Sequence, residues 1–147
     1  MRKTILFIGS LLIASVFVFT VACGSSSSTT TAPAAGKTIA TGPAGNNLTA
    51  TVANVDGVLR KGKQEFTLTF TDAAGRAVDV GSVALNYRMA AMGSMAEMNN
   101  GATFTSTGTP GVYSGKTDIE MAGEWQAQIT YEGPAGKGAF KLPIIAK

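Results

Sequence analysis

A run of evenly spaced methionines is the clearest chemical feature of the sequence. The segment YRMAAMGSMAEMNNG, residues 87–101, carries a thioether at every third position. The chain has six methionines including Met1, and four of the others fall within this one segment. Thioethers are soft, uncharged ligands that suit Cu(I), or Ag(I) as its mimic, although methionine also fills irregular gaps in apolar cores. The candidate ligands here are Met89, Met92, Met95 and Met98.

The step of three restricts how these four side chains can be placed. Successive side chains on a β-strand point to opposite faces, so a step of three alternates faces and cannot bring all four into one core. An α-helix would spread them around its surface, a 3₁₀ turn would stack them, and a loop containing Gly93 would let them converge. We therefore expect Met89 to end a core strand and some of the others to leave the sheet, either as metal ligands or as filler at one end of the core.

The residues that most enzymes use for acid–base or nucleophilic chemistry are scarce in this chain. It contains no histidine, and its only cysteine is Cys23. Histidine is the commonest general base and the commonest ligand for borderline metals. The carboxylates Glu97, Asp118, Glu120 and Glu124 are scattered along segments whose period of two explains them as a solvated face. We expect no enzymatic activity.

The amino terminus has the features of an export signal. Arg2 and Lys3 precede an uncharged, largely apolar run, residues 4–22, that ends in small residues before Cys23. A single spanning helix of this length is the alternative, but the position of the cysteine argues against it. The arrangement resembles the lipobox of bacterial lipoproteins, with Thr20 where that family usually has leucine. This resemblance implies cleavage before Cys23, acylation of its thiol, and an extracytoplasmic protein held on a bacterial membrane by lipid.

Composition divides the chain into three parts. Residues 1–22 are the predicted signal peptide, residues 23–45 a lipidated cysteine and a flexible Ser/Thr/Gly linker, and residues 46–147 the folded domain. Without Arg2 and Lys3, 10 of the 12 Lys and Arg residues remain against 9 acids, so the mature chain is almost neutral. It has no clustered basic patch, which excludes nucleic acid as a partner. Gly24, in place of aspartate after the cysteine, favours the outer over the inner membrane in double-membraned bacteria.

The hydrophobic period of the domain is two, which is typical of strands with one buried face. The clearest strand, EFTLTFT, alternates Phe66, Leu68 and Phe70 with threonines. GEWQAQITY places Trp125 on the predicted inner face, and Pro143 in AFKLPIIA indicates an edge strand. About seven such segments and no amphipathic helix predict an all-β fold, an immunoglobulin-like antiparallel β-sandwich.

Two segments together resemble the YtkA-like domain: YRMAAMGSMAEM, followed by GVYSGKTDIEMAGEWQAQITY. In that family a methionine-bearing segment precedes a Gly-x-Tyr strand and a Met-x-Gly-x-Trp strand entry. The matching positions of the second segment are Gly111, Tyr113, Met121, Gly123 and Trp125. The resemblance extends over about residues 48–147. It differs in the alanines Ala90, Ala91 and Ala96, where relatives commonly carry prolines. It implies a sandwich fold and a context of copper handling or heavy-metal efflux, and it makes Met121 a candidate fifth ligand.

Two hypotheses of function remain open from the sequence. The first is a membrane-anchored, extracytoplasmic lipoprotein domain that binds Cu(I) or Ag(I) through the methionines. The second is an interaction module without metal, in which the methionine segment is an adaptable apolar surface for another envelope protein, such as a metal-efflux component.

The predicted lipid anchor can be tested by the change Cys23→Ser. We expect the variant precursor to stay uncleaved or to reach the wrong compartment, because the serine oxygen cannot accept the lipid that permits cleavage. Membrane fractionation combined with a mass measurement of the chain checks this. Processing and membrane retention equal to those of the parent chain would contradict the anchor.

Overall fold

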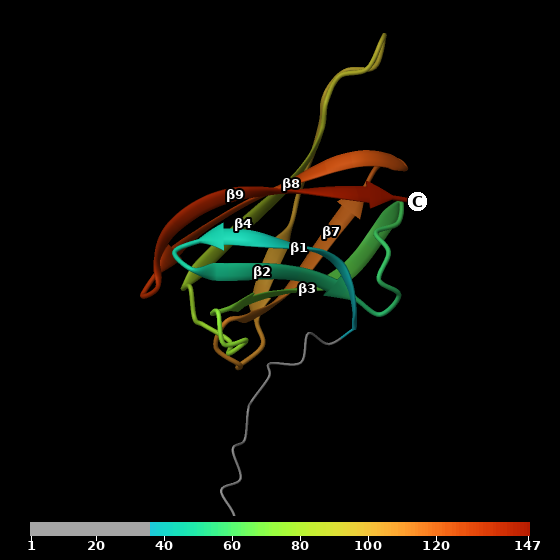
Figure 1. Ribbon diagram of the computed structural model, residues 1–147. Helices are drawn as coiled ribbons and strands as arrows, with labels where there is room; N and C mark the ends of the chain where they lie inside the picture. Colours follow the sequence, from blue (N-terminus) through green and yellow to red (C-terminus); the bar gives the residue numbers. More distant parts are fainter. Residues whose placement is uncertain (1–35) are drawn as a thin grey trace, which may run out of the picture.

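The computed structural model describes residues 36–147, which form two antiparallel β-sheets packed face to face (Figure 1). The five-stranded sheet has the order β1-β2-β3-β7-β6, and the four-stranded sheet has the order β5-β4-β8-β9. This confirms the predicted antiparallel sandwich, with nine strands instead of about seven. The predicted signal peptide and Cys23 lie outside the described residues. The strands are β1 (Lys37–Gly45), β2 (Leu48–Asn54), β3 (Gly62–Thr71), β4 (Ser82–Met89), β5 (Met98–Gly101), β6 (Thr103–Ser106), β7 (Val112–Ile119), β8 (Gly123–Gly133) and β9 (Gly136–Ala146).

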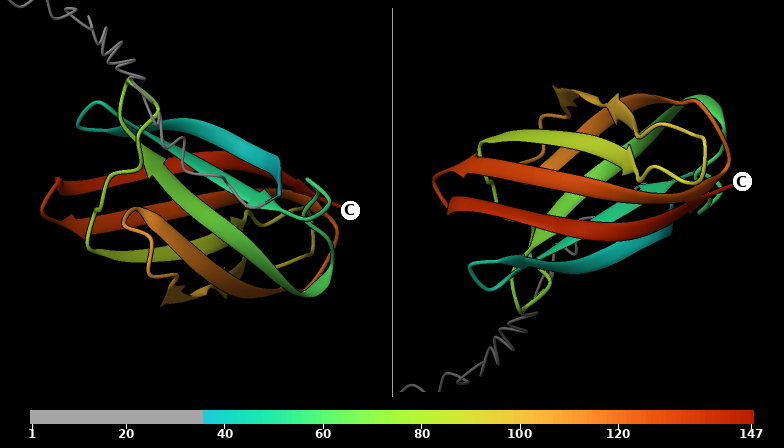
Figure 2. Two further views of the ribbon diagram at one scale, coloured as in Figure 1. Left: turned by 90° about the horizontal axis from the view of Figure 1, so that it is seen from below. Right: turned by 90° about the horizontal axis from the view of Figure 1, so that it is seen from above.

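The alternation read from the sequence predicts the core correctly. Phe66, Leu68 and Phe70 of β3 are all buried, and they face the buried side chains of β8 across the sandwich. Trp125 is 2% exposed, which confirms its inward orientation. Pro143 lies in β9, which is the edge strand of the four-stranded sheet, as predicted. The right-hand view of Figure 2 shows β4, β8 and β9 side by side in this sheet.

Aromatic side chains join the two sheets at the centre of the core. The ring of Phe70 in β3 packs edge-on against the rings of Tyr131 and Phe140 in the opposite sheet, at centroid distances of 5.3 and 6.2 Å. Edge-to-face pairs of this kind stabilise a core beyond the area they bury, by about 0.5–1.5 kcal/mol each. The hydroxyl of Tyr131 donates a hydrogen bond to the Ala44 carbonyl (3.1 Å) and accepts one from Asn46 Nδ2 (3.0 Å). Tyr131 therefore ties β8 to the turn between β1 and β2.

The sandwich begins earlier than the sequence predicted. Residues 37–45, expected to belong to the flexible linker, form β1 and pair with β2 along their whole length. β1 lacks a clear period of two because it is an edge strand with Gly42 and Pro43 in its interior. The feature that indicates a strand here is the turn that follows β1, where Asn46 and Asn47 both have positive φ, +51° and +59°. Two such residues are typical of a tight β-hairpin, which requires a strand on each side.

The second strand beyond the seven predicted is β5, which lies where the chain changes sheets. β5 pairs with β4 in the four-stranded sheet, and β6 pairs with β7 in the five-stranded sheet. Only Ala102 separates β5 from β6, and its amide donates to the carbonyl of Leu85 at 2.9 Å. One of the seven segments predicted from the sequence, ATFTS around Phe104, corresponds to β6, whereas the four residues of β5 are too few for a period of two to be recognised.

No helix within residues 36–147 is long and apolar enough to cross a membrane.

The change Trp125→Ala tests the core. Trp125 is buried, and its indole Nε1 donates to the Met121 carbonyl at 3.0 Å, so truncation leaves a cavity and an unpaired carbonyl. We expect a loss of about 3–5 kcal/mol in the free energy of unfolding. Chemical denaturation measures it, with Val55→Ala as the control: Val55 is 84% exposed, so its truncation should change stability by less than about 0.5 kcal/mol. Equal losses for the two variants would contradict the placement of Trp125.

Candidate methionine site

The methionine segment forms a β-hairpin that projects from one end of the sandwich, drawn in olive and yellow at the top of Figure 1. Met89 and Met98 are direct partners in the β4–β5 ladder. Met92 and Met95 are partners in an isolated bridge, with amide-to-carbonyl bonds of 3.1 and 2.9 Å in the two directions. The connecting turn is Gly93-Ser94, in which Gly93 has φ +58°. A positive φ at the first of two turn residues is the position where hairpins favour glycine.

The hairpin register divides the four methionines into two cross-strand pairs. Directly opposite residues of an antiparallel ladder share a face, and a step of three moves to the other face. Met89 is 1% exposed and faces the core, and Met98 on the same face is half-buried. Met92 and Met95 are 53% and 40% exposed. We call Met92 and Met95 the tip pair.

Met121 lies in the turn between β7 and β8, at the same end of the sandwich as the inward-facing pair, because Gly123 of this turn contacts the Met89 side chain. Met89, Met98 and Met121 all pack against the same hydrophobic core. The Asn100 side-chain amide in β5 donates to Glu120 Oε1 at 3.3 Å, which holds β5 against the residue that precedes Met121. We call Met89, Met98 and Met121 the inner cluster. Three thioethers therefore gather at one end of the sandwich, at the foot of the projecting hairpin.

Gly123 allows the Met89 side chain to reach this turn. A Cβ atom at Gly123 would lie 2.8 Å from Met89 Cε and 4.0 Å from Met89 Sδ, so any larger residue would displace the thioether. Gly123 also has φ +142°, a conformation that residues with a Cβ rarely adopt. Trp125 is fixed to the same turn by its bond to the Met121 carbonyl. In the Met-x-Gly-x-Trp pattern, Met121 thus supplies one thioether, Gly123 leaves space for the thioether of Met89, and Trp125 anchors the turn.

The charged groups of the hairpin are paired with each other. The Arg88 guanidinium binds Glu97, and Asn99 Nδ2 donates to the other Glu97 oxygen at 3.0 Å. These bonds, that from Arg88 first, lower the pKa of Glu97 to about 2. The carboxylate is therefore ionised at all ordinary pH values and its oxygens are engaged, which leaves it unsuited to act as a general base. Arg88 balances its charge, so this part of the hairpin is electrically neutral.

Two residues that neighbour Met89 and Met98 in the β4–β5 ladder have a buried oxygen without a hydrogen-bond partner. Tyr87 and Asn100 are partners in the ladder and occupy the next position on the same face as Met89 and Met98, toward the interior of the sandwich. The Tyr87 hydroxyl and Asn100 Oδ1 are both buried and unpaired. Burial raises the pKa of Tyr87, so its hydroxyl stays neutral. Neutral oxygen dipoles here, together with the Glu120 carboxylate beside Met121, make this end of the sandwich more favourable for a cation than a wholly apolar core.

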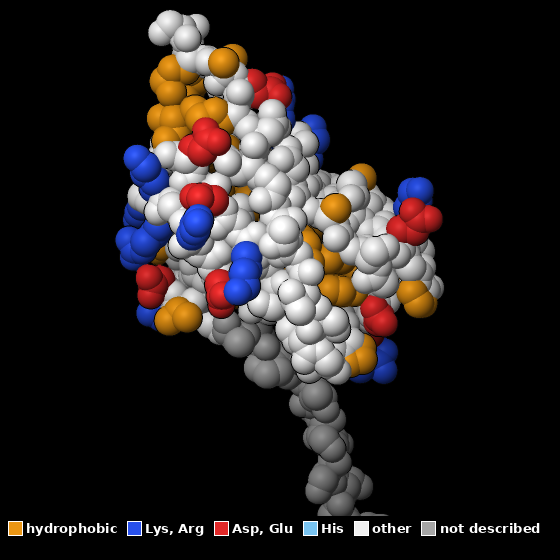
Figure 3. Space-filling model, turned by 180° about the vertical axis from the view of Figure 1, so that it is seen from behind, with side chains coloured by type: hydrophobic (Ala, Val, Ile, Leu, Met, Phe, Trp, Pro, Cys, Tyr) orange, Lys and Arg blue, Asp and Glu red, His pale blue; other side chains and the backbone are white. Residues whose placement is uncertain are grey.

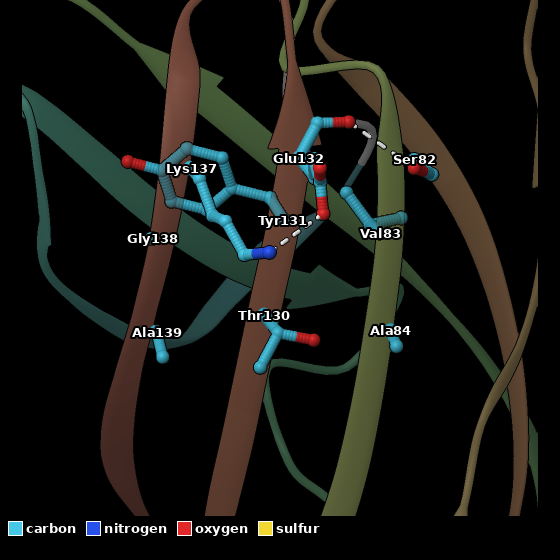
Figure 4. A pocket seen from close by; sticks show the side chains of 9 residues that line it. All are labelled: Ser82, Val83, Ala84, Thr130, Tyr131, Glu132, Lys137, Gly138 and Ala139. Atoms are coloured by element: carbon cyan, nitrogen blue, oxygen red, sulfur yellow. Dashed lines mark hydrogen bonds and ion pairs between the residues drawn. The ribbon is translucent and has the colours of Figure 1, made fainter.

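Surface hollows lie at both ends of the outer face of the four-stranded sheet. A hollow of about 630 Å³ lies on the outer face of the four-stranded sheet, at the end opposite to the methionines, and Lys137 and Glu132 at its rim pair with each other at 3.0 Å (Figure 4). A groove of about 410 Å³ lies on the same face at the foot of the hairpin, between Ala90, Pro143 and Ile145. Among residues 36–147, no group of three or more His, Cys, Asp or Glu side chains is arranged to hold a metal ion.

The five predicted ligands therefore occupy two separate places. The sequence named these five side chains as candidates, and that role stays a prediction; it did not indicate their pairing or the contact of Asn100 with Glu120. The signal for the pairing was present, because the methionines are arranged symmetrically, Met-x-x-Met and Met-x-x-Met, about the two turn residues Gly93 and Ser94. A symmetric pattern about a two-residue turn indicates a hairpin. Asn100 and Glu120 had no such signal, since a contact between β5 and the β7–β8 turn is not encoded locally.

Mild oxidation distinguishes the two groups. Sulfoxide forms fastest at exposed thioethers. With limiting hydrogen peroxide we expect Met92 and Met95 to be oxidised first, Met98 and Met121 more slowly, and Met89 last, at least about tenfold slower than the tip pair. Peptide mass spectrometry over a time course measures each rate, and the same experiment on the denatured chain is the control, in which the rates should converge. Oxidation of Met89 at the rate of Met92 in the folded chain would contradict this placement.

Comparison with models of known protein families identifies the family of this chain. Residues 44–130, which include β2 to β7, the methionine hairpin, Met121 and most of β8, match the model of the YtkA-like family. The match covers more than half of the chain, and it confirms the resemblance found in the methionine segment and in the Met-x-Gly-x-Trp strand entry. The comparison with curated proteins gave no match. The chain belongs to the YtkA-like family.

Proposed function

We propose that this protein is a membrane-anchored, extracytoplasmic domain that binds Cu(I) or Ag(I) through methionine sulfur, with the inner cluster as its principal site. One observation carries the proposal: Met89, Met98 and Met121 come from three different segments and gather at one end of the sandwich. Met89 and Met98 are opposite each other across the ladder, and Met121 is brought in by the turn that Asn100 and Trp125 hold.

The donor set suits a soft monovalent cation. Three neutral thioethers satisfy the preference of Cu(I) and Ag(I) for sulfur, whereas zinc and Cu(II) prefer imidazole or thiolate ligands. The neighbouring Glu120 carboxylate lies on the surface and supplies a negative charge that attracts a cation at short range. Methionine carries no proton to be displaced, so metal binding here releases none.

The anchoring part of the proposal rests on the sequence around Cys23. An acylated cysteine, followed by a polar tract rich in Ser, Thr and Gly, would hold the domain near a membrane surface on a flexible tether. With a small domain and no acid–base machinery, such a protein fits a role as a metal carrier or metal buffer in the cell envelope, beside a metal-efflux protein, better than a role as an enzyme.

Trp125 provides a built-in reporter for the inner cluster. Its indole is bound to the Met121 carbonyl, and it is the only tryptophan of the chain, so a heavy or redox-active ion at the cluster should quench its fluorescence. In the full chain in detergent, under anaerobic and reducing conditions, we expect Cu(I) to quench Trp125. The double change Met98→Leu and Met121→Leu should weaken binding by at least about tenfold in competition with a Cu(I) chelator and remove the quenching.

The matched control is the double change Met92→Leu and Met95→Leu. Leucine keeps the apolar volume and removes the sulfur, at a cost below about 1.5 kcal/mol per buried site, so the folds should remain comparable. The control should retain both the quenching and the affinity of the inner cluster. Affinity should also stay nearly constant between about pH 5 and pH 8, the range in which imidazole and thiolate ligands lose or gain protons. Equal metal retention by the parent and the inner-cluster variant would refute the proposal.

A second candidate function is an apolar docking surface without metal. The exposure of Met92 and Met95, together with Ile145 (63% exposed) beside the groove at the foot of the hairpin, favours it. Methionine side chains adapt to varied partners. Crosslinking in native membranes separates the two functions: a docking surface would keep its partner when Met92 and Met95 become leucine and lose it when they become lysine, with no dependence on copper.

A further inference from the structure

The tip pair offers two soft sulfur ligands, which is half of a site with four thioethers. Met92 and Met95 face each other across the end of the hairpin, bonded backbone to backbone and largely exposed. Directly opposite residues in an antiparallel pair have Cβ atoms about 4.5–5.5 Å apart, which lets both sulfur atoms contact one ion. Two neutral thioethers leave a soft cation with open coordination positions.

The rest of the hairpin cannot complete this site. Between the tip pair and the β4–β5 ladder lie Ala90, Ala91 and Ala96, which have no donor atoms in their side chains. Glu97 is held by Arg88 and Asn99. The inner cluster lies on the other face and three residues further along each arm, about 10 Å away at the rise of a strand. In the described part of the chain, every other soft donor is therefore out of reach.

The surface around the tip pair suits a second, identical hairpin. Its small alanine side chains allow close approach, and the backbones of residues 90, 91, 96 and 97 make no backbone hydrogen bonds to each other within the described chain. The Arg88–Glu97 pair makes the hairpin neutral, so two copies do not repel each other. In the view of Figure 3 hydrophobic side chains gather on the projecting end of the molecule, and the tip stands clear of the sandwich.

We propose that the tip pair is one half of a Cu(I) or Ag(I) site that a second copy of this chain completes, so that one ion bridges two hairpins tip to tip. A two-fold axis through the ion would supply Met92 and Met95 twice and surround it with four thioethers, in an interface that uses the same surface on both copies. The inference rests on the proposed metal function and extends it to a second site. Tethering of the chains on one membrane would favour the encounter.

A bridging ion has a characteristic dependence on metal concentration. Dimers increase as silver is added, then decrease when excess silver loads each tip separately, so the dimer signal passes through a maximum. A metal that merely stabilises a dimer formed elsewhere gives a signal that rises and stays high. The inner cluster takes up silver as well, so the clearest measurement uses the Met98→Leu and Met121→Leu variant, in which the maximum should fall near one silver ion per two chains.

The experiment is a titration of the full chain in detergent with Ag(I), followed by native mass spectrometry. We expect the inner-cluster variant to form a species of two chains with one silver ion, and the Met92→Leu and Met95→Leu variant to remain monomeric while its Trp125 fluorescence is still quenched. We expect the Met92→Leu and Met95→Leu variant, the tip variant, to form at least about nine-tenths less dimer than the parent chain. The replacement of methionine by leucine removes all four bridging sulfur atoms.

The outcomes separate this inference from the proposed function. A parent chain that binds silver and quenches Trp125 but stays monomeric overturns the bridged dimer and leaves the inner cluster standing. Equal dimer formation by the parent and the tip variant also overturns it. Failure of every variant to retain silver overturns both proposals. A dimer signal with no maximum on adding excess silver shows that the ion does not bridge, and overturns the inference.

Discussion

The register of the β4–β5 hairpin is the constraint on which the methionine site depends. Tyr87 and Met89 point into the core and are almost completely buried, so β4 cannot slide by one residue without exposing both. Once β4 is fixed, the pairing of Met89 with Met98 follows from the Gly93-Ser94 turn, since a two-residue turn determines which residues face each other. The inward position of one sulfur pair and the outward position of the other are consequences of this single register.

The two sulfur groups differ in environment although their chemistry is the same. The inner cluster lies at the edge of the core, near Glu120 and Asn100, and its geometry is set by contacts between β4, β5, β8 and the β7–β8 turn. The tip pair is held by two backbone hydrogen bonds at the end of an arm lined with alanine. A preorganised site binds more tightly because less ordering is required on binding, whereas an exposed site exchanges its ligand more readily. In the proposed function, the inner cluster would hold a soft ion and the tip pair would exchange it.

Charged side chains pair with each other at the surface of the described domain. Among residues 36–147, the charged side chains that the structure brings together form exposed pairs, such as Arg76 with Asp72 and Lys116 with Glu65. Exposed pairs of this kind contribute little to stability. The domain therefore relies on its aromatic and aliphatic core, in which Phe70, Tyr131 and Phe140 connect the two sheets. The thioethers of Met89, Met98 and Met121 lie at one end of this core.

The sequence alone determined the features that depend on local alternation and residue type. The period of two in EFTLTFT and GEWQAQITY predicted the buried faces of β3 and β8, and the restriction of proline in sheets predicted the edge position of β9. The methionine spacing and the Met-x-Gly-x-Trp strand entry also predicted the family. These signals are strong because one buried face repeats over many residues.

Tertiary structure alone decided what depends on contacts between distant segments. β1 owes its existence to the ladder with β2 and to the bond between Tyr131 and the Ala44 carbonyl, and its own residues are too small and irregular to indicate a strand. The division of the five methionines into an inner cluster and a tip pair required the pairing of β4 with β5 and the contact of β5 with the turn at Glu120. Spacing along the chain specifies the face of each side chain, but only the packing of strands far apart in sequence determines which faces meet.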